Sequence, residues 1–112
     1  SGPTNVYFNM ENLVTGIQPI GSNIPDKFSL SQNYPNPFNP VTNIEFAVPK
    51  SSYVKLVVYD IRGSLVETLV AQQLSAGTYK ADWNAVKYSS GIYFYSIQTN
   101  DFTETKRMVL VK

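Results

Sequence analysis

The chain has 112 residues, which is enough for one domain with its own core and too few for two. Its hydrophobic fraction of 43% is typical of a globular domain, and its net charge of +1 gives no electrostatic basis for binding nucleic acid. The absence of cysteine and histidine excludes disulfides, thiolate chemistry and the commonest general base and metal ligand. No apolar run approaches the roughly 20 residues of a membrane-spanning helix, and no signal-peptide pattern opens the sequence.

Residues 1–27 are expected to form a tether that precedes the domain. Ser1-Gly2-Pro3 resembles a remnant of cloning, so we expect the chain to be a fragment of a longer protein. Residues 5–15 begin with alternating apolar and polar side chains, which favours a half-buried strand. Residues 16–26 have no periodicity and contain glycines and prolines, which predicts a linker without core residues.

Residues 34–40 contain three prolines in seven positions. Proline fixes φ and lacks a backbone donor, so neither a helix nor a central strand can run through this stretch. We expect Tyr34 and Phe38 to be aromatic anchors, and Phe38 to be buried at one end of the domain, because a segment with few donors depends on side-chain packing. Asn36 and Asn39 are expected to bond nearby backbone groups. The residues of this structural motif are Tyr34, Pro35, Asn36, Pro37, Phe38, Asn39 and Pro40.

The rest of the chain predicts a series of short strands separated by turns. Residues 65–74 have apolar spacing that is partly helical, but their β-branched residues favour a strand. Residues 92–97 are apolar at nearly every position, which suits a central strand covered on both faces. The expected strands cover residues 28–30, 42–48, 53–61, 65–74, 78–84, 92–97 and 103–111. This series predicts an all-β, antiparallel sandwich of about seven strands.

Two turns are expected to require glycine. Gly63 follows an Asp that can bond its own backbone, and Gly91 follows two serines. A positive φ at either position has little cost only for glycine, so Gly63 and Gly91 are expected to be structural residues.

Trp83 has two interpretations. With Tyr79, Tyr88, Tyr93 and Tyr95 it could form an aromatic platform that stacks on sugars. It could instead fill the core of the sandwich, with the tyrosines placing their hydroxyls near water, and we favour this second interpretation. The exposure of the Trp83 ring distinguishes the two.

No residue pattern predicts a reaction. The acidic residues fall mainly in turns or on the polar side of strands, and no Asp/Asn cluster has the spacing of a calcium loop. The sequence also has no glycine-rich phosphate loop. We therefore expect no enzyme, no metal and no cofactor. Lys106, Arg107 and Lys112 could form a docking patch, or could protect an edge strand from aggregation.

Five motifs resemble a known family in their sequence and order. They are residues 34–40, Val57-Val58-Tyr59-Asp60 with Gly63, Ser75-Ala76-Gly77-Thr78-Tyr79, Ser90-Gly91-Ile92-Tyr93-Phe94-Tyr95 and Thr105-Lys106-Arg107-Met108-Val109-Leu110-Val111-Lys112. Over about residues 28–112 the chain resembles the type A C-terminal sorting domain of the type IX secretion system. It departs from the family at Val41 and Arg107, where threonine and lysine are more usual.

The resemblance implies a delivery function on an immunoglobulin-like sandwich. Such domains lie at the C-terminus of secreted cargo in certain Gram-negative bacteria, and an outer-membrane translocon recognises them. Cargo would pass through the periplasm to the cell surface or the medium, and an edge strand could also support a homodimer. The residues expected to be recognised by the translocon are Gly91, Lys106, Arg107, Met108, Val109, Leu110, Val111 and Lys112.

The resemblance further implies that a sortase-like peptidase separates the domain from an N-terminal cargo domain at the preceding linker. An accessible, extended segment suits cleavage. The expected cleavage linker includes Gly16, Gly21, Ser22, Asn23 and Asp26. The alternative is a carbohydrate-binding or spacer sandwich appended to a secreted enzyme, similar to the immunoglobulin-like domain of flagellar hook-capping proteins.

Overall fold

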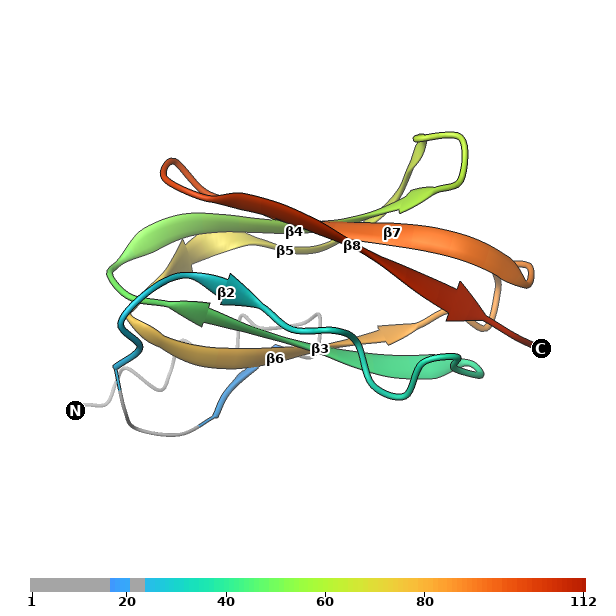
Figure 1. Cartoon of the computed structure of the whole chain (residues 1–112), viewed down its shortest axis with the longest axis horizontal. Helices are drawn as coiled ribbons and strands as arrows, with labels where there is room; N and C mark the ends of the chain where they lie inside the picture. The colour runs from blue at the N-terminus through green and yellow to red at the C-terminus, as the bar shows by residue number, and fades with distance from the viewer. Residues whose placement is uncertain (1–16, 21–23) are drawn as a thin grey trace.

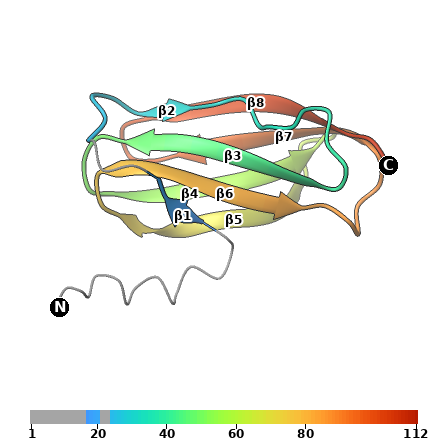
Figure 2. The ribbon, with the colours of Figure 1, turned by 90° about the horizontal axis from the view of Figure 1, so that it is seen from below.

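Two four-stranded antiparallel sheets pack face to face in the computed structural model, which describes residues 17–20 and 24–112 (Figures 1 and 2). The first sheet has the order β1-β6-β3-β2, and the second has the order β5-β4-β7-β8. The strands are β1 (Gln18–Pro19), β2 (Ser29–Leu30), β3 (Val41–Val48), β4 (Ser52–Asp60), β5 (Leu65–Leu74), β6 (Gly77–Asn84), β7 (Gly91–Gln98) and β8 (Thr103–Leu110). The predicted all-β sandwich is confirmed. The described residues include no helix long and apolar enough to cross a membrane.

The period-two alternation of the strands builds the core. In β3, Ile44 and Phe46 point inward and Glu45 is exposed. The register pairs Ile44 with Ala81 of β6, which is also buried. The predicted central strand, β7, lies between β4 and β8, but the expectation that both of its faces are covered is wrong, because the first sheet covers only its inward face. Alternation thus directs one apolar face of each sheet into a shared core.

Two bulges in β5 account for the irregular apolar pattern of residues 65–74. The register of β5 against β4 passes from Val70 to Thr68, so Leu69 is an extra residue, and a second shift follows near Val66. A bulge adds one residue without a partner, which breaks strict alternation and lets Leu69 and Val70 both be buried. The strand predicted from the β-branched residues is therefore confirmed, and the spacing that looked helical marks bulges.

The expectation of a tether without core residues is wrong for residues 17–20. Ile17 is only 2% exposed and belongs to the core, while β1 pairs with Tyr79 and Lys80 of β6. The Ile20 N–H also donates to the Thr78 carbonyl at 2.7 Å. One apolar residue followed by a two-residue strand is too short to show a periodic pattern in the sequence. The strand expected at residues 5–15 lies outside the described residues.

The connection between β2 and β3, residues 31–40, lies beside the final strand. We call it the strap. Figure 1 shows it at the same end of the sandwich as the C-terminus. Because β8 is at the margin of its sheet, the strap is in a position to cover the edge of β8.

Candidate functional site

The strap is fastened to β8 by its backbone and by one buried ring. The Phe38 N–H donates to the Val109 carbonyl at 3.0 Å, and the Val111 N–H donates to the Phe38 carbonyl at 2.9 Å. The Phe38 ring is 2% exposed and lies 5.7 Å from the Trp83 ring, centroid to centroid. Burial of Phe38 at one end of the sandwich agrees with the sequence prediction.

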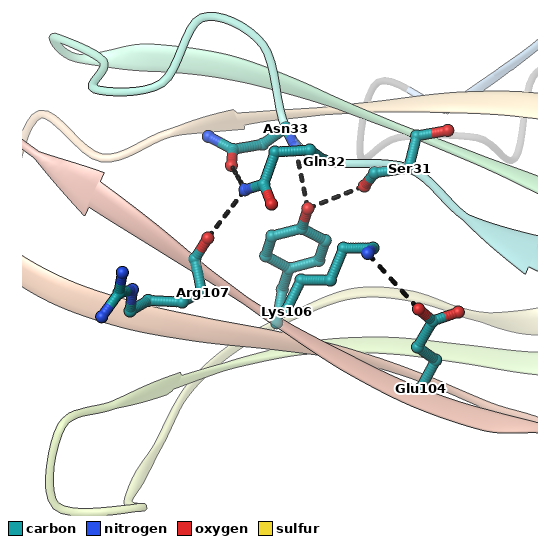
Figure 3. Close-up of polar contacts among 7 residues, drawn as sticks. Ser31, Gln32, Asn33, Glu104, Lys106 and Arg107 are labelled. Atoms are coloured by element: carbon teal, nitrogen blue, oxygen red, sulfur yellow. Dashed lines mark hydrogen bonds and ion pairs between the residues drawn. The ribbon is translucent and has the colours of Figure 1, made fainter.

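Two amides of the strap extend this contact along β8. The Val109 N–H donates to Asn36 Oδ1 at 3.0 Å, and Gln32 Nε2 donates to the Arg107 carbonyl at 2.7 Å (Figure 3). Backbone groups of alternate residues point to the same edge of a strand, so residues 107, 109 and 111 present their outer edge to the strap. The strap therefore occupies the edge of β8 over its last residues.

The Tyr95 hydroxyl joins the strap to β7. It accepts a hydrogen bond from the Asn33 N–H and donates one to the Ser31 carbonyl, both at 2.7 Å. Burial raises the pKa of Tyr95 to about 12; the bond from Asn33 lowers it, and the charge of Glu104 raises it. The hydroxyl thus keeps its proton at neutral pH and holds the start of the strap as a donor.

Asn33 is the principal residue of this contact that sequence reasoning missed. Its side chain is buried and donates to the Pro35 carbonyl at 3.1 Å and to Thr42 Oγ1 at 2.9 Å. Thr42 Oγ1 in turn donates to the Pro35 carbonyl at 2.9 Å. Pro35 lies outside the strands, so its carbonyl has no partner in a sheet, and these two side chains supply its hydrogen bonds. Its position immediately before the proline-rich residues 34–40 is the sequence feature that could have indicated this role.

The residues expected to be recognised by the translocon divide into two sets. Met108 and Leu110 are core residues, and Lys106 is half-buried with its amine 3.4 Å from a Glu104 oxygen. Figure 3 shows Lys106 directed toward Glu104 and Arg107 directed away from it. Val109 is half-buried on the outward side, and the exposed members are Gly91, Arg107, Val111 and Lys112. Only the outward set can meet a partner while the domain is folded.

The C-terminal residues are also held in place. The Lys112 N–H donates to Ser90 Oγ at 2.9 Å, and the Lys112 amine bonds the Val86 carbonyl. The register places Gly91 opposite Leu110. The structure therefore brings the two ends of the predicted recognition set together at one end of the sandwich.

Three other predicted residues have clear positions. Trp83 is 1% exposed and donates from Nε1 to Glu67 Oε1 at 3.0 Å, so the sugar-stacking platform is wrong and the core interpretation holds. Tyr34 is 78% exposed, so its prediction as an anchor is wrong: its backbone pairs with Asn43, and its ring faces solvent. Gly63 has φ of 86°, as expected for its turn.

Other predicted site residues have these positions. Gly91 has φ of 157°, a positive value that residues with a side chain rarely adopt, so the expected positive φ is present, although an added Cβ would meet no atom within 4 Å. In the cleavage linker, Asp26 is exposed, while Gly16 and residues 21–23 lie outside the described part. Residues 17–20 and 24–112 contain no group of three acidic residues that could hold a metal.

Comparison with known proteins gives one family and one fold. The family model described as the secretion system C-terminal sorting domain matches residues 32–112. A search of curated proteins finds no match. Among solved structures, the chain is similar to one from a study of PorZ, described as an essential bacterial surface component of the type-IX secretion system of Porphyromonas gingivalis, with a TM-score of 0.51 and 19% identity. The match covers 78% of this chain and 12% of that chain, and at this identity it shows the fold alone.

Proposed function

This chain belongs to the family of C-terminal sorting domains of the type IX secretion system, and we propose that an outer-membrane translocon recognises it through β8 and that a sortase-like peptidase frees it from its cargo. A sorting domain is a non-catalytic secretion signal, so its work is done by binding. Its cargo crosses the outer membrane, and we place the cargo finally at the cell surface or in the medium.

The observation that carries the proposal is the family match over residues 32–112, which begins in the strap and ends with β8. These are the two segments that Phe38, Asn36 and Gln32 fasten together. The matched sequence therefore corresponds to one assembled structure, in which the strap fixes the final strand.

A reporter fusion tests this function. The whole chain, fused to the C-terminus of a periplasmic reporter, is expressed in a bacterium that has the type IX system. The fusion has to include residue 17, because Ile17 belongs to the core. We expect the reporter on the surface or in the medium, and in the periplasm when the translocon is deleted. Periplasmic retention of the fusion in the intact host, with the domain folded, would contradict the proposed function.

Cleavage falls, in this proposal, between β1 and β2. Ile24 and Asp26 are exposed and lie outside any strand, whereas residues 18–19 are paired with β6. A peptidase requires an accessible segment that can extend into its active site, which paired residues do not provide. Limited proteolysis followed by mass spectrometry is expected to cut first within residues 21–27. First cuts within residues 17–20, or inside the strands, would refute this location.

A further inference from the structure

The outer face of the first sheet is polar and carries both signs of charge. β3 directs Asn43 and Glu45 outward, and β6 directs Lys80 and Asp82 outward in register with them. Such a surface is typical of a solvated sheet face, with hydrophilic residues alternating against the buried ones. The outer face of the second sheet, on the opposite side of the sandwich, can be compared with it.

The outer face of the second sheet carries a group of apolar side chains toward the end where β4 finishes and β7 begins, beyond a middle row of Val57, Ser96 and Thr105. The register sets Tyr59, Phe94 and Arg107 in one row across β4, β7 and β8, and it sets Ile92 beside Val109 in the next. The Tyr59, Phe94, Ile92 and Val109 side chains are half-buried although no other layer of the described structure covers them. Gln98 Nε2 donates to the Tyr59 hydroxyl at 3.3 Å, which helps to hold that ring along the sheet.

Among the strands that the structure describes, none places a carboxylate on this face. The acidic residues of these four strands are Asp60, Glu67 and Glu104, and each lies opposite a buried residue of a neighbouring strand, on the inward side. The opposed pairs are Asp60 with Tyr93, Glu67 with Val58 and Glu104 with Ile97. The only charged residues at outward positions are therefore Lys55 and Arg107. Neither takes part in the ion pairs found among the described residues.

From these observations we infer that the outer face of the second sheet docks a protein whose surface is flat and apolar and carries carboxylates opposite Lys55 and Arg107. This rests on the proposed function, because Arg107 and Val109 belong to the strand on which recognition is placed. Two cations at outward positions, Arg107 beside Phe94 and Lys55 beside Gln98, without a competing carboxylate in these strands, give charge complementarity to an acidic partner. Aromatic residues and arginine are also the side chains enriched in protein interfaces.

The geometry favours face-to-face docking over the addition of a strand at β8. The strap already bonds the edge groups of Arg107, Val109 and Val111, so an incoming strand would have to displace it. A membrane surface is a weaker match, because only two cations lie at outward positions of these strands, whereas segments that bind anionic lipid carry clusters of about four to eight. Moreover, the apolar residues are half-buried in a sheet and form no protruding wedge.

Two charge reversals on this face test the inference in the full reporter fusion. The variant Lys55→Glu with Arg107→Glu is compared with Lys50→Glu with Lys87→Glu, which alters net charge equally at exposed positions outside all strands and outside the proposed cleavage segment. We expect surface display to fall about tenfold or more for the first pair and to match the wild type for the second. A third variant, Phe94→Thr, removes the ring while keeping a strand-forming side chain and should also lower display. The denaturant midpoint of each purified variant shows whether it remains folded.

The outcomes separate the inference from the proposed function. If the wild-type fusion is not exported, the proposed function fails. If it is exported and the Lys55/Arg107 variant is displayed equally well, only the docking face is refuted. Equal loss in both charge variants would also overturn the docking face, since net charge alone would then explain the effect.

A vesicle-binding experiment tests the membrane alternative. Purified wild type is mixed with vesicles of phosphatidylethanolamine and phosphatidylglycerol in a 3:1 ratio, so that about a quarter of the lipid is anionic. Binding that the Lys55/Arg107 variant loses would assign the face to a membrane and overturn the protein partner; absence of binding supports the inference.

Discussion

The two sides of β8 face different surroundings, although both belong to one strand of eight residues. Met108 and Leu110 point inward and complete the core, whereas Arg107 and Val109 point outward beside Phe94 and Ile92. Because side chains alternate along a strand, the residues of the core and those of the proposed recognition surface are interleaved in sequence although they are separated in space. Removal of the C-terminal segment therefore cannot test recognition by itself, but single substitutions can.

The largest effect should come from deleting residues 108–112. The deletion removes Met108 and Leu110, each worth about 2–5 kcal/mol as a core side chain, and the backbone partners of Phe38. Their sum is comparable with the total stability of about 5–15 kcal/mol of a small domain. We expect no cooperative thermal transition by circular dichroism. A truncated domain that still melts cooperatively would show that β8 is less essential to the core than its burial indicates.

The strap offers the same comparison in two aromatic residues. Phe38→Ala should cost about 3–5 kcal/mol, because the ring is buried against Trp83. Tyr34→Ala should change stability by no more than about 0.5 kcal/mol, because the ring faces solvent. Urea unfolding of both variants measures the difference. Equal midpoints would mean that the strap is not anchored by its buried ring.

The Tyr95 hydroxyl tests the polar side of the strap contact. Tyr95→Phe leaves the Asn33 N–H and the Ser31 carbonyl without their partner, which should cost about 1–3 kcal/mol. The pKa of Tyr95 is raised from 10 to about 12 in the folded state, so stability from the neutral hydroxyl is complete below pH 10 and is lost as the pH rises toward 12. The difference in stability between wild type and Tyr95→Phe should therefore shrink over that interval. A difference that is constant with pH would contradict this account.

The turn between β4 and β5 provides a backbone test away from the strap. Gly63 has φ of 86°, and Asp60 Oδ1 accepts hydrogen bonds from the Arg62 and Ser64 N–H groups at 2.9 Å. Gly63→Val should cost about 1–3 kcal/mol, because a β-branched residue is strained at positive φ. Arg62→Val in the same turn is the control, with an expected change within about 0.5 kcal/mol. Similar losses in both variants would locate the cost in the turn's polar contacts instead of in φ.

Most of the fold could be predicted from sequence because alternation is a local signal. The long strands, the burial of Phe38 and Trp83, and the turn at Gly63 all follow from residue type and spacing. The prediction failed where a contact depends on distant partners. Ile17 enters the core only because β6 lies beside it, and a single apolar residue in a Gly/Pro-rich stretch carries no periodicity.

The location of the candidate site could be predicted from the sequence, but the assignment of its residues to the inward or outward side of β8 could not. The family motif directed attention to the last strand, yet it could not separate Met108 and Leu110 from Arg107, because a motif records sequence order and not the face to which each side chain points. Register supplied that information. The capping of the β8 edge by Asn36 and Gln32 was likewise hidden, since it joins residues more than 70 positions apart.

The smallest effect on stability, and the most specific one on export, is expected from single substitutions at neighbouring positions of β8. Arg107 is exposed on the outer face, so Arg107→Ala should change the unfolding free energy by no more than about 0.5 kcal/mol. Lys106 is turned to the other side, where it pairs with Glu104, and a pair of this kind contributes about 0–1 kcal/mol. If recognition uses the outer face, Arg107→Ala lowers surface display of the reporter while Lys106→Ala leaves it near the wild-type level. The two variants remove the same unit of charge from adjacent residues, so charge alone cannot account for a difference between them, and the side of the strand on which each residue lies can. Display that falls equally in both would assign recognition to the charge of the segment, and the division of β8 into two working sides would be wrong.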